Sequence, residues 1–97
     1  MLVDDLGFSD IGCFGSEIPT PNLDALAGGG LRYTDYHSYP MCSPTRAALL
    51  TGLEPHRAGV GHVAHSDPGY PGYAMELTRH APTLAELLRS DGYQTLM

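Results

Sequence analysis

The sequence contains no lysine and no tryptophan, and only two of its 97 residues are cysteine. All five basic side chains are arginines, which are dispersed among eleven acidic residues and leave a net charge of −6. Nucleic-acid phosphates attract clustered positive charge, and this chain has no such cluster. We therefore expect no nucleic-acid partner.

Long apolar runs are also missing. No run approaches the ~20 residues that a membrane-spanning helix needs, and no signal peptide is visible. We therefore expect no membrane-spanning segment, and the sequence makes no prediction about cellular localisation. A structural disulfide is also not expected, because Cys42 stands among polar and charged residues and Cys13 lies in a glycine-flanked loop.

Twelve glycines and eight prolines predict many loops between a few regular elements. Helices are expected after Thr20, in the Cys42 segment with Pro44 in the first turn and Gly52 as the end, and from a Thr83–Glu86 capping box to Gly92. Strands are expected at residues 1–3, 31–38 and 93–97, and an irregular loop at residues 53–82. Because the terminal strands would need neighbours, residues 1–97 are expected to be an N-terminal part of a larger catalytic domain and to fold poorly alone.

The most informative stretch is Cys-Ser-Pro-Thr-Arg at residues 42–46, followed by Ala-Ala-Leu-Leu-Thr-Gly. If a helix begins here, Cys42 and Arg46 lie on one face, because residues four apart are neighbours on a helix. A thiol at a helix N-terminus also meets unpaired backbone N–H groups and the positive end of the helix dipole. This arrangement predicts an anionic substrate.

The pattern Cys-x-Pro-x-Arg, running into an Ala/Leu helix and Thr-Gly, resembles the signature of the type I sulfatases. Three further blocks resemble the same family in the same order: residues 3–10, residues 20–27, and residues 83–88 with 92–95. The resemblance implies an α/β fold of the alkaline-phosphatase-like class, with a central sheet flanked by helices.

The resemblance also implies the chemistry. Cys42 would be oxidised by a formylglycine-generating enzyme to formylglycine, whose hydrate attacks the sulfur of a small sulfate ester and then expels sulfate. Arg46 would contact the modified side chain and the anionic substrate. Asp4 and Asp5, with Cys42, would bind a divalent cation, usually Ca²⁺, with Mg²⁺ as the alternative. Adjacent carboxylates after an apolar strand suit a hard cation on their own chemistry.

Several alternatives remain open. A phosphodiester or phosphonate monoester hydrolase of the same superfamily would share the nucleophile, and a catalytically incomplete relative would bind metal at most. Cys42 with His62 and His65 could hold Zn²⁺, and Asp4 and Asp5 could be a solvated turn. A cysteine phosphatase is excluded, because its loop has five residues between Cys and Arg and this chain has three.

Two positions depart from the family's usual pattern. Thr45 stands where serine is common, and Leu53 where a basic residue often follows Thr-Gly. The family's catalytic lysines and remaining metal ligands have no counterpart in these 97 residues. Sequence alone therefore predicts part of an active site.

Overall fold

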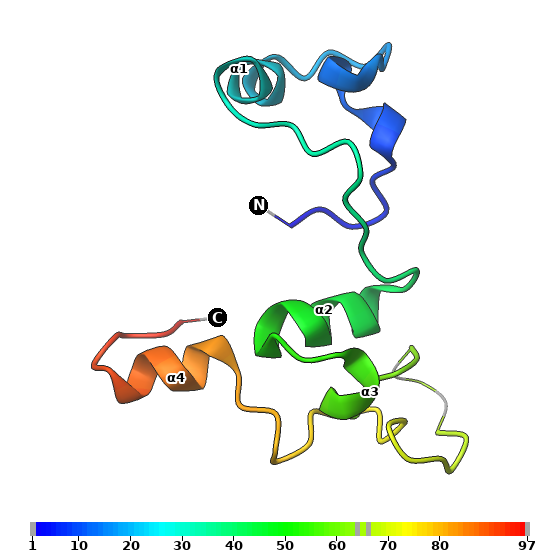
Figure 1. The fold of residues 1–97 in the computed structure, drawn as a ribbon, viewed down its shortest axis with the longest axis vertical. Helices are drawn as coiled ribbons and strands as arrows, with labels where there is room; N and C mark the ends of the chain where they lie inside the picture. The colour runs from blue at the N-terminus through cyan, green and yellow to red at the C-terminus, as the bar shows by residue number, and fades with distance from the viewer. Residues whose placement is uncertain (1, 64, 66, 97) are drawn as a thin grey trace. The chain divides into compact units, whose positions relative to one another are not determined.

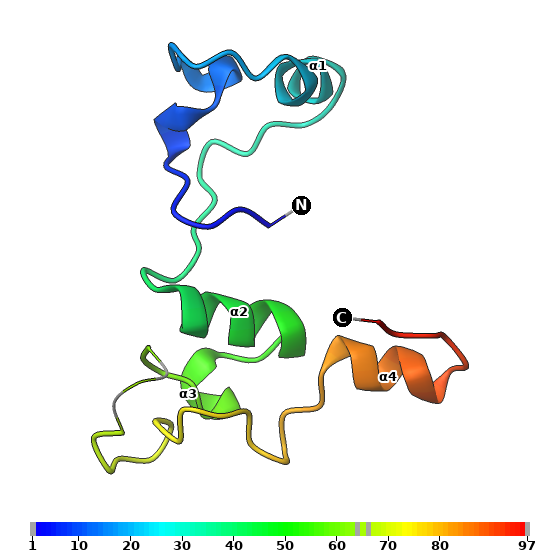
Figure 2. The ribbon, with the colours of Figure 1, turned by 180° about the vertical axis from the view of Figure 1, so that it is seen from behind.

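A computed structural model describes residues 2–63, 65 and 67–96, which form two units, Met1–His37 and Ser38–Met97. The first unit contains the 3₁₀ turns η1 (Phe8–Asp10) and η2 (Gly12–Phe14) and the helix α1 (Pro21–Gly29). The second contains α2 (Cys42–Thr51), α3 (Pro55–Ala58) and α4 (Leu84–Ser90). Figures 1 and 2 show the chain from opposite sides.

In the first unit, Thr20 connects α1 to η2. The helix begins at Pro21 and ends at Gly29, as the Thr-Pro start and the glycine triplet predict. Thr20 does not cap α1 with its side chain; its hydroxyl accepts the Gly12 N–H at 2.9 Å and donates to the Asp24 carboxylate at 3.0 Å. Gly12 fits here because a Cβ would lie 2.6 Å from Asp24 Oδ2. The loop and the helix are therefore joined by a polar contact.

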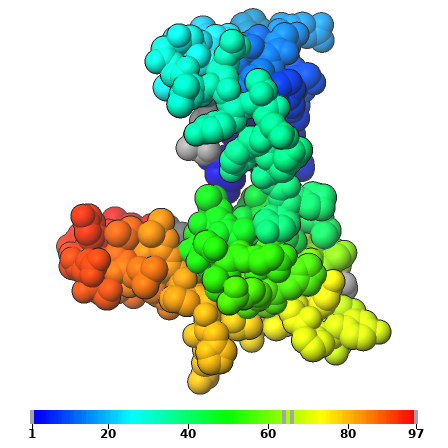
Figure 3. All heavy atoms as spheres, viewed as in Figure 1, coloured from blue at the N-terminus to red at the C-terminus, as the bar shows by residue number. Residues whose placement is uncertain are grey.

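In the second unit, α2 packs against α3 over a small core. Its buried hydrophobic residues are three alanines and one valine, and two leucines pack against them: Ala47, Ala58, Val60 and Ala81, with Leu53 and Leu77. Larger apolar side chains stay outside. On α4, for example, Leu84 is 56% and Leu87 53% exposed, and Figure 3 shows this orange and red segment as an arm at the side of the unit.

The ends of α4 agree with the sequence. Thr83 Oγ1 accepts the Glu86 N–H at 3.2 Å, and Glu86 Oε2 accepts the Thr83 N–H at 2.7 Å, which completes the predicted capping box. Gly92 follows with φ +89°, and its N–H bonds to the Arg89 carbonyl at 3.1 Å. Only glycine adopts this left-handed conformation without steric cost, so the helix stops here.

The prediction of strands near both ends and at residues 31–38 is wrong for the described residues. Residues 2–3, 31–38 and 93–96 have irregular backbone, while Met1 and Met97 lie outside the described residues. A strand requires a neighbour to take its backbone hydrogen bonds, and among the described residues the one β contact is the isolated antiparallel bridge between Val60 and Tyr73. The helices of an α/β protein are therefore present here, whereas its sheet is not formed by this chain's described part.

The segment expected to be wholly irregular, residues 53–82, contains more structure than predicted. It includes α3, which Glu54 caps by accepting the His56 N–H at 2.9 Å, and the Val60–Tyr73 bridge. Pro55 at the first helical position was the available signal. In the part of the chain that the structure covers, no helix is both long and apolar enough to cross a bilayer.

Candidate active site

Cys42 is the first residue of α2, and its side chain is exposed. Met41 precedes it with extended backbone and, in the described structure, offers no side-chain cap. Pro44, at the third position of the helix, is buried and has no N–H to leave unpaired. The start of α2 therefore presents the Cys42 thiol beside the positive end of the helix dipole, which favours an anion.

Arg46 lies one turn further along α2 and is exposed, as Cys42 is. Pro44 and Ala47 are the buried residues of this helix. The helix therefore packs inward through Pro44 and Ala47, while the Cys42 thiol and the Arg46 guanidinium both remain accessible to solvent. This distribution agrees with the spacing argument, and the catalytic roles of the two side chains stay a prediction.

Asp4 and Asp5 belong to the first unit, where they form an exposed bend. Asp5 has φ +51°, a conformation that aspartate and asparagine tolerate better than most residues. Asp10 lies nearby in the sequence, and its Oδ2 accepts the Gly7 N–H at 2.7 Å.

The carboxylates at positions 4 and 5 have the right donor chemistry for Ca²⁺ or Mg²⁺, which take oxygen ligands. They are an incomplete set, because no group of three or more His, Cys, Asp or Glu side chains suited to a metal occurs among the described residues. Cys42 lies in the other unit, so its joint binding of a cation with Asp4 and Asp5 stays a prediction.

The zinc alternative gains no support. His62 and His65 have ring centroids 6.5 Å apart, and within residues 2–63, 65 and 67–96 no metal-binding group combines them with Cys42. Cys13 and Cys42 are both free thiols in the structure.

Sequence reasoning missed a hydrogen-bonded chain from Glu54 through His56 to Tyr73. Glu54 Oε1 lies 3.1 Å from His56 Nδ1, and His56 Nε2 lies 3.1 Å from the Tyr73 hydroxyl. The His56 hydrogen bond is the main cause that lowers the pKa of Glu54 below its ordinary value. An ionised carboxylate only accepts, so Nδ1 carries a proton, and in the neutral ring Nε2 accepts from Tyr73.

Two glycines make room for His56, Gly61 beside its ring and Gly72 beside its backbone. A Cβ at Gly61 would lie 2.5 Å from His56 Cδ2, and one at Gly72 would lie 2.9 Å from the His56 carbonyl oxygen. The Gly61 N–H also bonds to the Gly72 carbonyl at 2.9 Å. Gly61 and Gly72 thus both lie against His56 of α3, on which the α2 helix packs. A Gly-rich loop after Glu-Pro-His was the signal in the sequence.

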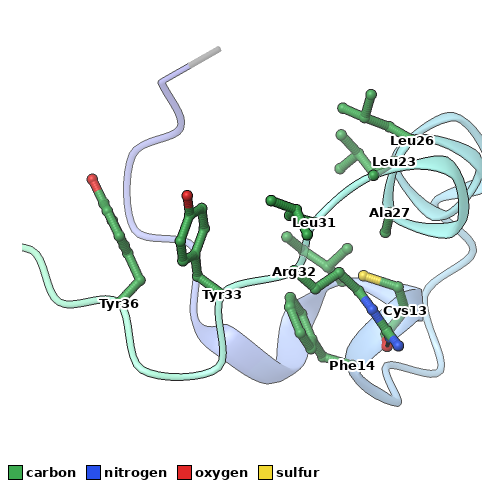
Figure 4. Close-up of a pocket in the computed structure, with 11 residues that line it drawn as sticks. Cys13, Phe14, Leu23, Leu26, Ala27, Leu31, Arg32, Tyr33 and Tyr36 are labelled. Carbon is green, nitrogen blue, oxygen red and sulfur yellow. Dashed lines mark hydrogen bonds between the residues drawn. The ribbon is translucent and has the colours of Figure 1, made fainter.

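A separate groove of about 580 Å³ lies in the first unit between α1 and residues 30–36. Figure 4 shows Leu23, Leu26 and Leu31 gathered on one side of it and Tyr33 and Tyr36 standing together on the other. Arg32, at its rim, donates to the Cys13 carbonyl oxygen at 2.9 Å. The groove contains none of the four predicted site residues, so we assign it no part in the chemistry.

Comparison with known proteins shows the family of this chain. The sequence profile of the Sulfatase family matches residues 1–97, which is the whole chain. The chain belongs to the sulfatase family. It is 46% identical over 99 residues to a Klebsiella aerogenes protein named arylsulfatase, with all of this chain and 21% of that protein covered.

Two human sulfatases are also similar. The identity is 43% over 104 residues to arylsulfatase A and 37% over 100 residues to steryl-sulfatase, and the alignments cover all of this chain with 19% and 17% of those proteins. This sulfatase chain therefore spans about a fifth of the length of the relatives it matches.

Proposed function

We propose that the protein is a sulfuric ester hydrolase that uses residue 42 as its nucleophile and belongs to the arylsulfatase-like group. The observation that supports this most is the start of α2, where Cys42 and Arg46 remain exposed on a helix whose buried residues are Pro44 and Ala47. Family membership supports the same reading, because the matched relatives bear the names arylsulfatase and steryl-sulfatase.

Formylglycine formed from Cys42 would supply a hydrated aldehyde, which is both a nucleophile and an internal route for releasing sulfate. The first turn of α2 contributes the surrounding electrostatics. Its backbone N–H groups and dipole favour negative charge beside residue 42, and the Arg46 guanidinium adds a positive charge that would stabilise the sulfate oxygens.

We also propose that Asp4 and Asp5 supply two of the ligands of a divalent cation, Ca²⁺ or Mg²⁺. When bound, the cation would neutralise charge and acidify a bound hydroxyl. The two carboxylates would hold the cation through oxygen donors, and further ligands would have to complete the set. Residues 1–97 would then be an N-terminal part of an alkaline-phosphatase-like α/β catalytic domain.

The test is hydrolysis by the full protein, produced in cells that contain the formylglycine-generating enzyme, of an aryl sulfate, an aryl phosphodiester and an aryl phosphonate with the same leaving group. The expected result is a kcat/KM for the sulfate at least tenfold above that for the other two, roughly 1.4 kcal/mol of discrimination. Preference for the phosphodiester or phosphonate would establish the alternative esterase, and no turnover of any ester would establish the catalytically incomplete relative.

The matched variants are Arg46→Lys and Arg57→Lys. Arg46→Lys keeps the charge but removes the planar fork that can contact two sulfate oxygens, so kcat/KM should fall, by roughly 10- to 100-fold. Arg57 in α3 is also exposed and serves as the control, with kcat/KM expected within twofold of the unmodified protein.

A further inference from the structure

The Thr45 side chain, near the start of α2, makes a hydrogen bond to a residue outside the helix. Its hydroxyl lies 2.8 Å from the Met41 carbonyl oxygen and 3.0 Å from that of Tyr39, so its proton is shared between two acceptors. The Met41 contact joins residues four apart and is common for threonine in helices. The Tyr39 contact reaches outside the helix, to a residue six positions earlier.

The N-cap residue of this helix, Met41, makes no side-chain capping bond in the described structure. Helices are commonly capped by a Ser, Thr, Asp or Asn side chain. The segment from Tyr39 to Met41, just before α2, is therefore tied to the helix by the Thr45 side chain. Cys42 directly follows Met41, whose carbonyl oxygen is one of the two that accept the Thr45 hydroxyl.

Thr51 shows what the local contact does alone. It lies on the same helix, and its hydroxyl donates to the Ala47 carbonyl at 2.7 Å, again four residues back. It accepts the Leu53 N–H at 3.2 Å, so its effect is confined to the end of α2 remote from Cys42. Thr45 and Thr51 can therefore be compared directly: the Thr45 hydroxyl contacts the end of α2 that carries Cys42, and the Thr51 hydroxyl contacts the other end.

We propose that Thr45 is a positioning residue for residue 42: its hydroxyl fixes the Tyr39–Met41 turn and so orients the nucleophile at the start of α2. Serine would preserve this bond, which explains why threonine at a position where sulfatases often have serine is compatible with function. β-Branching restricts χ1, so threonine holds the hydroxyl in place with less loss of freedom. The catalytic part of this inference rests on the function proposed above.

The test compares Thr45→Val, Thr45→Ser and Thr51→Val in the full protein. Deuterium exchange of the peptide covering residues 39–46 measures the turn directly. Exchange should be roughly three- to tenfold faster in Thr45→Val, the factor expected for losing one net hydrogen bond, and within twofold of the parent in Thr45→Ser and Thr51→Val. Thr45→Ala repeats the measurement should the valine variant not fold.

The second readout is kcat and KM for an aryl sulfate, divided by the fraction of formylglycine at position 42 measured by mass spectrometry. In Thr45→Val this corrected kcat should fall roughly three- to tenfold with KM within twofold, and Thr45→Ser should restore it. Unchanged exchange and unchanged corrected kcat would overturn the proposal, and so would a variant that loses only formylglycine content. If the parent protein hydrolyses no sulfate ester, the proposed function fails, while the exchange measurement still decides whether Thr45 fixes the turn.

Discussion

Replacing Gly61 by alanine should destabilise the second unit through the His56 ring. The new methyl carbon would lie 2.5 Å from His56 Cδ2, 2.7 Å from Nε2 and 3.0 Å from the Gly72 carbonyl oxygen. The ring cannot turn away without losing its contacts with Glu54 and Tyr73. Forcing a methyl group into filled space costs about 1–3 kcal/mol, and because the His56 side chain is 50% exposed and can yield toward solvent, we expect about 1 kcal/mol.

Urea denaturation of the full protein would measure this change as a lower transition midpoint. Gly28→Ala is the matched control, because Gly28 lies inside α1 with no atom within 4 Å of the added Cβ. Alanine there should stabilise the helix by roughly 0.5–1 kcal/mol. The same substitution is therefore expected to have opposite signs at the two positions.

A double-mutant cycle identifies the ring as the cause. In a His56→Ala background the space beside Gly61 is empty, so Gly61→Ala should cost much less than in the parent protein. An equal cost in both backgrounds would refute the account of the Glu54–His56–Tyr73 chain given above, because the strain would then lie in the backbone.

Three further predictions follow from other contacts. Tyr73→Phe removes the hydroxyl bonded to His56 and should speed deuterium exchange of residues 59–75 roughly three- to tenfold. Tyr70 is exposed in the same loop, so Tyr70→Phe is the control and should leave the exchange unchanged. Hydrogen bonds from the Thr83 N–H and hydroxyl hold the pKa of Glu86 below its ordinary value of 4.5. The ionised Glu86 therefore stabilises α4 above that pH, and this stabilisation is lost as the pH falls through the lower pKa of the folded state. The difference in unfolding free energy between the protein and Glu86→Ala should shrink toward zero in that acid range, and a pH-independent difference would contradict the prediction. Asp5→Asn keeps a residue suited to φ +51° but removes the charge, so the bound divalent cation measured by elemental analysis should fall well below one per chain while the unfolding midpoint without metal stays the same.

Local signals predicted the helices well. Pro21 and the following glycines set the ends of α1, Gly52 ends α2, and the Thr83–Glu86 pair caps α4. Each of these features acts within one turn of the chain, so sequence spacing is enough to recognise it. The shared exposure of Cys42 and Arg46 follows from the same short-range geometry.

Features that depend on distant residues were not predicted correctly. Residues 31–38 alternate apolar and polar side chains, yet a strand forms only where another strand pairs with it, and the described chain supplies no such neighbour. The His56–Tyr73 bond spans seventeen residues, and the pattern of the sequence does not specify that pairing. The joint binding of a cation by Asp4, Asp5 and Cys42 stays a prediction, because metal ligands converge through the tertiary fold rather than through sequence spacing.

The most direct test of the account is the chemical state of residue 42 in catalytically active protein. Trypsin cleaves after Arg32 and Arg46, so the peptide of residues 33–46 isolates Cys42. In the full protein, produced with the formylglycine-generating enzyme and shown to hydrolyse an aryl sulfate, the mass of this peptide should correspond to loss of one sulfur and two hydrogens and gain of one oxygen. An unmodified thiol at Cys42 in protein that hydrolyses the sulfate ester would contradict the proposed mechanism.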